Sequence, residues 1–272
     1  MRKKFAEFIK SKLKEREDLI VLLGDISVGL FLDDSENLPL RVHNVGILEQ
    51  SMISMAAGMS SRGYEVFIHT ISPFIIERAF EQIKLDIAYN KNKVILVSAN
   101  GPGDYNKLGP THHCFSDVPL MRLLPGLQIY TPGRNEDVVR CLEAALFGKS
   151  PAYIRLTSRA SAISTEVGTI NIEEPVNIKV LNIFMGESLR HFELNRELIR
   201  NDWIYSYKFD EIDVGLLAQY KEIVFWEPYS SPLAGPYYRQ CLPTTTKISS
   251  MIYPLSIELG IFDVPEYTCV IV

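Results

Sequence analysis

The sequence predicts an α/β protein with a parallel β-sheet that is covered by helices on both faces. Apolar runs of strand length lie at 18–25, 64–70, 93–99, 127–132 and 152–156. Helical segments are expected between them, at 47–62, 74–90 and 135–147. With 47% hydrophobic residues among 272, the chain also has enough apolar material for a large core. Continuous apolar strands that alternate with helices are typical of a sheet buried on both sides.

The first 16 residues predict an amphipathic helix rather than a targeting signal. Four apolar residues are spaced so that they share one helical face: Phe5, Phe8, Ile9 and Leu13. Lysines and arginines interrupt the segment, which therefore lacks the continuous apolar stretch of a secretory signal. We expect this helix to pack against the core.

Charge and hydropathy argue against two classes of partner. The net charge is −5 and the isoelectric point is about 5.6, whereas nucleic acids and anionic membranes attract basic surfaces. No apolar run approaches the length of a transmembrane helix. The cysteines form no CxxC pair, which favours free thiols in the cytoplasm over a disulfide framework. We expect a cytoplasmic protein that binds neither nucleic acid nor membrane.

The chain is predicted to form two domains, at 1–165 and 175–272. The stretch 161–175 between them is typical of a linker. Beyond it we expect a strand at 178–186, a polar helix near 187–200 and a strand at 222–226. These elements predict a second, smaller α/β domain.

The segment 43–63 (HNVGILEQSMISMAAGMSSRG) carries Glu49 near the start of a predicted helix that is rich in small residues. Gly58 lowers the stability of that helix, so a closely packed partner is expected there. Two interpretations of Glu49 stay open on these residues alone. Either its charge complements the helix dipole, typically by about 0.3–1 kcal/mol, or its buried carboxyl contacts a heterocycle.

A long Gly/Pro-rich loop at 100–117 follows a strong strand and carries two adjacent histidines, His112 and His113. Loops of this length inside compact α/β domains are usually functional. The carboxyl ends of strands are also where open α/β sheets build ligand sites. No cysteine or carboxylate stands at zinc spacing. We therefore expect a functional loop that binds no metal.

Three motifs resemble the pyrimidine-binding domain of thiamine diphosphate enzymes of the transketolase and deoxyxylulose-phosphate synthase family. They are NVGILEQSM followed by AAGM, then ISPFIIERAFEQI, then GPTHH. The resemblance extends over residues 15–160. It implies a parallel-sheet pyrimidine-binding domain, followed by a shortened and divergent domain of the transketolase C-terminal type.

The resemblance implies roles around the expected cofactor, thiamine diphosphate. Glu49 stands at the position of the family's catalytic glutamate, which hydrogen-bonds the aminopyrimidine and promotes its imino tautomer. Phe74 is expected to stack on the pyrimidine, and Ile47 to contact the cofactor. Arg78 is expected either in a structural ion pair or in binding the cofactor or a substrate phosphate.

The resemblance also implies residues for the substrate. His112 is expected to be catalytic and to bind the substrate by a hydrogen bond or proton transfer. His113 departs from the family's common glutamine, and His69 stands where the family often has serine. Leu108 replaces an aspartate that recognises a substrate hydroxyl, so hydroxyl recognition is not assumed. A ketose, an α-keto acid and an unusual sugar therefore remain open as substrates.

The run PAYIRLTSRAS at 151–161 resembles the end of the pyrimidine-binding domain, where an arginine binds a substrate phosphate. Arg159 is the first candidate, although its spacing is one residue longer than in the family. Arg155 is the second candidate. A guanidinium suits a phosphate because it donates two parallel hydrogen bonds, whereas the competing interpretation is two solvated arginines.

The diphosphate-binding half of such enzymes is missing from this sequence. Its hallmark is Gly-Asp-Gly followed further on by Asn, and neither GDI at 24–26 nor GDY at 103–105 continues in that way. We therefore expect a separate subunit that carries the GDG…N motif and holds the diphosphate through Mg²⁺ or Ca²⁺. An α2β2 assembly is the simplest arrangement. No metal ligand is expected in this chain.

Three functions remain open. The first is a subunit of a transketolase-like transferase that moves a two-carbon ketol unit between sugars or sugar phosphates. The second is the β-type subunit of a 2-oxo-acid dehydrogenase or decarboxylase, whose loop normally lacks the GPTH sequence. The third is a non-catalytic binding relative, which the presence of Glu49, Phe74 and His112 disfavours.

Overall fold

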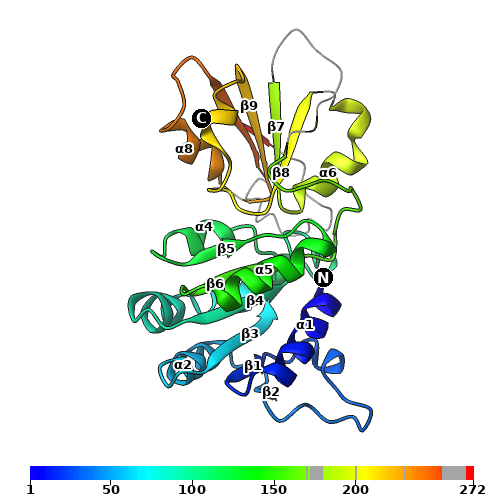
Figure 1. Cartoon of the computed structure of the whole chain (residues 1–272), viewed down its shortest axis with the longest axis vertical. Coiled ribbons are helices and arrows are strands. Elements are labelled where there is room, and N and C mark those ends of the chain that lie inside the picture. The colour runs from blue at the N-terminus through cyan, green and yellow to red at the C-terminus, as the bar shows by residue number, and fades with distance from the viewer. Residues whose placement is uncertain (170, 172–179, 200, 230, 253–267) are drawn as a thin grey trace.

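The computed structural model describes the chain except residues 170, 172–179, 200, 230 and 253–267. Two β-sheets organise the described residues, and they lie one above the other in Figure 1. This arrangement confirms the predicted α/β class, with a parallel sheet followed by a smaller α/β part. The boundary expected between 165 and 175 falls partly outside the described residues, so the exact division remains a prediction.

The first sheet has six strands in the order β2-β1-β3-β4-β6-β5, and every pair of neighbours is parallel. Its strands are β1 Leu19–Leu23, β2 Val42–Asn44, β3 Glu65–Ile71, β4 Val94–Ala99, β5 Gln128–Tyr130 and β6 Ala152–Leu156. Five of them match the apolar runs in the sequence. The edge strand β2 was not predicted, because two of its three residues are exposed and no apolar run marks it.

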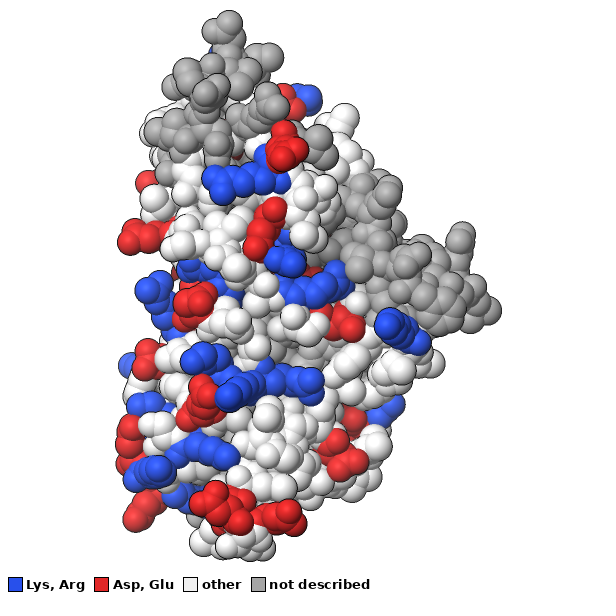
Figure 2. Space-filling view, turned by 90° about the vertical axis from the view of Figure 1, so that its right-hand side faces the viewer, with Lys and Arg blue, Asp and Glu red and all other residues white. Residues whose placement is uncertain are grey.

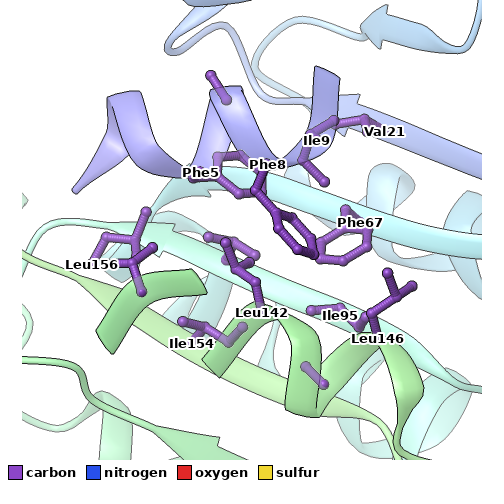
Figure 3. Packing of buried hydrophobic residues seen from close by; sticks show 14 of the residues in the cluster. Phe5, Phe8, Ile9, Val21, Phe67, Ile95, Leu142, Leu146, Ile154 and Leu156 are labelled. Carbon is purple, nitrogen blue, oxygen red and sulfur yellow. The ribbon is translucent and has the colours of Figure 1, made fainter. Parts of the chain in front are cut away.

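Helices cover both faces of this sheet. They are α1 Arg2–Glu15 and α5 Asn135–Phe147 on one face, and α2 Glu49–Ser60 and α4 Asp117–Arg122 on the other. Figure 3 shows Phe5 and Phe8 of α1 pointing toward Phe67 of β3, with Leu142 and Leu146 of α5 nearby. All four apolar residues predicted for the face of α1 are buried, which confirms that this helix packs on the core.

The single helix expected at 74–90 is broken into three pieces. Two π-helical turns, Pro73–Glu77 and Ile83–Tyr89, flank the short α3 Phe80–Gln82. The N–H of Arg78 donates to the carbonyl of Pro73, five residues back, at 3.1 Å. Such π turns change the direction of the side chains that follow and are frequent at functional sites.

The second sheet has the order β11-β10-β9-β7-β8, in which only the pair β10–β11 is antiparallel. Its strands are β7 Val180–Met185, β8 Asp202–Ser206, β9 Glu222–Glu227, β10 Lys247–Ile252 and β11 Thr268–Ile271. The helices here are α6 Ser188–Leu194, α7 Val214–Leu217 and α8 Ala234–Arg239. Strands β7 and β9 match predicted strands. Polar residues interrupt β8 and β10, so neither gives an apolar run.

Buried polar contacts join the two sheets. The hydroxyl of Tyr205 on β8 donates to Asp137 of α5 at 3.0 Å and accepts from the N–H of Gly133 at 2.6 Å. The guanidinium of Arg155 on β6 pairs with Asp117 at 3.0 Å and lies 5.2 Å from the ring centre of Tyr229, beyond β9. Because these groups are buried, their contacts constrain how the two parts pack.

Charged side chains of both signs are interspersed on the face shown in Figure 2, and neither sign forms a continuous field there. In the part of the chain that the structure describes, no helix combines the length and the apolar character needed to cross a membrane.

Replacing Phe5 by alanine is expected to lower the free energy of unfolding by about 3–5 kcal/mol, because a large buried side chain leaves a cavity. Phe5 is 0% exposed and its ring lies 5.8 Å from Phe31 and 6.3 Å from Phe67. Chemical denaturation measures the change. Phe147→Ala is the matched control, since Phe147 is 65% exposed. Equal losses in the two variants would contradict the assignment of α1 to the core.

Candidate active site

The candidate site residues gather at the carboxyl edge of the first sheet. Glu49 follows β2, Phe74 follows β3, His112 lies in the loop after β4, and Arg159 follows β6. These strands are parallel, so their carboxyl ends meet at one edge of the sheet. Segments far apart in the chain therefore meet here.

Glu49 begins α2 and is 2% exposed. The turn before it passes through Gly46 at a φ of +75°, a left-handed conformation that glycine adopts without strain. One carboxylate oxygen, Oε2, accepts a hydrogen bond from Arg78 at 2.8 Å. The other, Oε1, is buried and has no hydrogen-bond partner among the described residues. A buried acceptor without a partner is costly, so this oxygen is suited to a donor from a ligand.

Phe74, Arg78 and His112 form a compact group beside Glu49. The guanidinium of Arg78 lies 4.4 Å from the ring centre of Phe74. The imidazole of His112 meets the same ring edge-on, with centres 5.3 Å apart. Asn100 donates its side-chain N–H to the carbonyl of His112 at 2.9 Å. The group therefore combines a carboxylate, a cation, an aromatic ring and an imidazole.

These residues fit the aminopyrimidine part of thiamine diphosphate. The unpartnered Oε1 of Glu49 offers an acceptor for a ring donor, and Phe74 offers an aromatic surface. Arg78 compensates the charge of Glu49 from a partly exposed position, with 43% of its side chain exposed. Among the described residues, no cluster of three metal-binding side chains is present.

Three further candidates lie around this group. Ile47 is 65% exposed and stands two residues before Glu49. Leu108 is 55% exposed on the long loop. The Nε2 of His113 is buried without a hydrogen-bond partner among the described residues, and its ring lies 5.6 Å from that of Phe115.

His69 lies in the interior rather than on a cavity wall. It is 0% exposed, and its ring lies 4.8 Å from that of Phe5. Its Nδ1 donates to the carbonyl of Val97 at 2.7 Å, so Nε2 accepts from the hydroxyl of Ser27 at 2.9 Å. Burial lowers the pKa of His69 to about 4, so the ring is neutral at pH 7. We do not retain His69 among the proposed substrate contacts, because both ring nitrogens are in use.

The two candidate arginines differ in position. Arg155 is 2% exposed and paired with the buried Asp117, so a phosphate would reach it only by opening that ion pair. Arg159 has a side chain that is 26% exposed, and its Nε donates to Asp104 at 3.3 Å. The guanidinium of Arg159 also bonds the carbonyl of Pro102. Arg159 is therefore the more accessible of the two.

Sequence reasoning did not single out Asn100 or Tyr105. Asn100 is 5% exposed, has a φ of +108°, and carries a buried Oδ1 without a partner among the described residues. The ring of Tyr105 lies 6.2 Å from that of His112. The only sequence signal for either residue was its place in the long loop.

Comparisons with known proteins give a consistent result. Residues 1–162 match the family described as the pyrimidine binding domain of transketolase. One of the two subunits of the apulose-4-phosphate transketolase of Actinobacillus succinogenes is 33% identical over 150 residues, which cover 55% of this chain and 48% of that protein. The 6-deoxy-6-sulfo-D-fructose transketolase subunit SqwH of a Clostridium species is 33% identical over 151 residues, covering 53% and 46%.

Solved structures agree in fold. A split-gene transketolase, solved as an inactive beta4 tetramer, superposes with a TM-score of 0.72 at 23% identity and covers 94% of this chain and 90% of that one. Transketolase from Campylobacter jejuni gives the same TM-score at 17% identity, but this chain covers only 42% of it. The chain spans about half the length of the curated relatives it matches.

The stability of the protein is expected to fall by about 2 kcal/mol between pH 7 and pH 5 on account of His69. Its pKa is about 4 in the folded protein and near 6.5 when unfolded. Between these values the unfolded chain binds the extra proton, so stability is lost as the pH falls. Chemical denaturation at both pH values should show a smaller drop for His69→Asn. His43→Asn, at an exposed position, should retain the full drop, and equal drops in both variants would refute the assignment.

Proposed function

Since the chain belongs to the transketolase pyrimidine-binding domain family, we propose that it is a subunit of a thiamine diphosphate-dependent transferase that moves a two-carbon ketol unit between sugars or sugar phosphates. The observation that carries the proposal is the half-paired carboxylate of Glu49. It is buried, it binds Arg78 through Oε2, and its Oε1 is left for a ligand. Family membership implies the cofactor, which supplies the carbanion chemistry when bound.

Glu49 and its neighbours are proposed to orient the cofactor. The Oε1 of Glu49 accepts a hydrogen bond from a proton-bearing nitrogen of the aminopyrimidine and can hold the proton that moves there. Arg78 keeps the carboxylate charged and aimed by its bond to Oε2. Phe74 stacks on the ring, and Ile47 covers it from the turn before α2.

His112 is proposed to act on the substrate. Its imidazole donates to, or accepts a proton from, a substrate oxygen near neutral pH. Its Nδ1 shares a hydrogen bond of 2.9 Å with the hydroxyl of Thr111, which leaves Nε2 for the substrate. His113 and Arg159 are proposed as further substrate contacts. Arg159 would meet a phosphate only by sharing its guanidinium with Asp104.

A separate subunit is proposed to supply the diphosphate-binding half and its Mg²⁺ or Ca²⁺, in an α2β2 assembly. The sequence contains no GDG…N pattern. Two similar proteins are themselves described as transketolase subunits, and the structural neighbour is described as a split-gene product that is inactive as a beta4 tetramer. These descriptions support the proposal that activity needs a second chain.

Glu49→Gln is expected to lower ketol transfer by at least about 100-fold, because a positioned acid–base group typically contributes 10²–10⁴ in rate. The assay uses this chain together with a subunit that carries GDG…N, with a ketose donor and an aldose acceptor. The chain without its partner is expected to show no turnover.

Glu81→Gln serves as the control, since Glu81 is an exposed carboxylate of the same region. An unchanged rate for Glu49→Gln would defeat the catalytic assignment. Tight binding of thiamine diphosphate and magnesium by this chain alone would defeat the split-subunit proposal.

Phe74→Ala is expected to raise the dissociation constant of thiamine diphosphate by about 10-fold, since an aromatic contact contributes about 0.5–1.5 kcal/mol beyond burial. Quenching of intrinsic fluorescence in the assembled enzyme measures the constant. Phe147→Ala, on the exposed side of α5, should leave it unchanged. Equal affinities in wild type and Phe74→Ala would exclude stacking by Phe74.

A further inference from the structure

One carboxylate, that of Asp104, joins the start of the histidine loop to the end of β6. We propose that Asp104 is a positioning residue that sets the placement of His112 for the reaction. This inference rests on the proposed function, because it concerns the same site. Asp104 itself lies eight residues before His112 and acts through the loop.

Asp104 accepts five hydrogen bonds. Its Oδ1 accepts from the hydroxyls of Thr157 at 3.2 Å and Ser158 at 2.7 Å, and from the Nε of Arg159 at 3.3 Å. Its Oδ2 accepts from the backbone N–H groups of Gly101 and Ser158, each at 2.8 Å. The side chain is 4% exposed. We call this set of bonds the Asp104 clasp.

The clasp reaches His112 through residues next to the bonded ones. Asn100 precedes the clasped Gly101 and holds the carbonyl of His112 at 2.9 Å. Tyr105 follows Asp104 and meets the imidazole edge-on, with ring centres 6.2 Å apart. These two contacts of His112 with the start of the loop therefore come from residues whose neighbours are fastened to the end of β6.

The second part of the chain packs against the same point. Glu187, just after β7, is 5% exposed, and a side chain at Gly101 would collide with its carboxylate. Gly101 therefore lies between the Asp104 clasp on one side and Glu187 on the other. Because the loop start is packed from both sides, a change at Asp104 is expected to be transmitted along the loop.

A cavity of about 410 Å³ borders the clasp. The loop and the residues after β6 form one wall of it, with Asn100, Asp104, Tyr105, Thr157 and Ser158. Releasing the clasp would thus move a cavity wall as well as the histidine. Small displacements of a reacting group are costly, since a misplacement of 1 Å can lower a rate by about 100-fold.

Asp104→Asn tests the proposal with little change in volume. An amide has one oxygen, so its NH₂ group would face N–H and O–H groups that now donate to Asp104. Amide hydrogen exchange in residues 101–113 of the free chain is expected to rise by about 10-fold. In the assembled enzyme, kcat is expected to fall by at least about 10-fold, while the dissociation constant of thiamine diphosphate stays within about twofold.

Asp213→Asn is the matched control. Asp213 caps α7 by accepting from the N–H of Gly215 at 2.8 Å, outside the candidate site, so loop exchange and kcat should stay as in wild type. Ser158→Ala removes only one hydroxyl donor of the clasp and should shift both readouts in the same direction by a smaller amount. It keeps the proposal testable if Asp104→Asn does not fold.

The outcomes separate this inference from the proposed function. A wild-type assembly without ketol transfer overturns the proposed function. An active wild type with unchanged kcat and loop exchange in Asp104→Asn, or in Ser158→Ala if the first does not fold, overturns the positioning role alone. Parallel losses of kcat and cofactor affinity also overturn it, because they indicate general damage to the fold.

Discussion

The parallel pairing of β1, β3, β4 and β6 is the constraint on which the rest of the structure depends. The four central strands are paired in register over their length, for example Leu22 with Ile68 and Ile68 with Leu96. Both faces are buried, so a strand that slipped by one residue would exchange the side chains of the two core clusters. Register therefore fixes where each strand ends, and the strand ends fix where the site residues meet.

Polar groups at that edge are held by a few ion pairs in low-dielectric surroundings. Arg78 pairs with Glu49, Arg155 with Asp117, and Arg159 with Asp104. Only the first pair leaves a carboxylate oxygen without a partner among the described residues. The other two carboxylates are fully used within the protein, which suits a structural role. The contrast separates the residue that is available to a ligand from those that build its surroundings.

The fold class and most of the first sheet follow from local patterns. Leu19–Leu23 and Val94–Ala99 are continuous apolar runs, and Phe5, Phe8 and Ile9 repeat at helical spacing. The π turns around Arg78 do not show in periodicity, because the sequence there remains compatible with an unbroken helix. The strands β8 and β10 escaped detection because polar residues interrupt them.

The candidate site could be predicted in its motifs but not in its contacts. The positions of Glu49, Phe74 and His112 at one edge follow from strand order, while the pairing of Arg78 with Glu49 depends on the turn between β3 and α3. The interior position of His69 was not predicted, because strand alternation does not say which residues of a doubly covered sheet reach the surface. Asp104 gave no signal, since its partners after β6 lie more than 50 residues away.

The long sequence separation of the Asp104 clasp bears on when the site forms during folding. The carboxylate must meet Ser158, which is 54 positions further along the chain. Contacts so distant in sequence form only after a large loop has closed. A ribosome-bound chain that ends before β6 can contain Glu49, Phe74 and His112 and still lack the partner that fastens the histidine loop. The geometry of the site is thus among the last features to be acquired as the chain is synthesised.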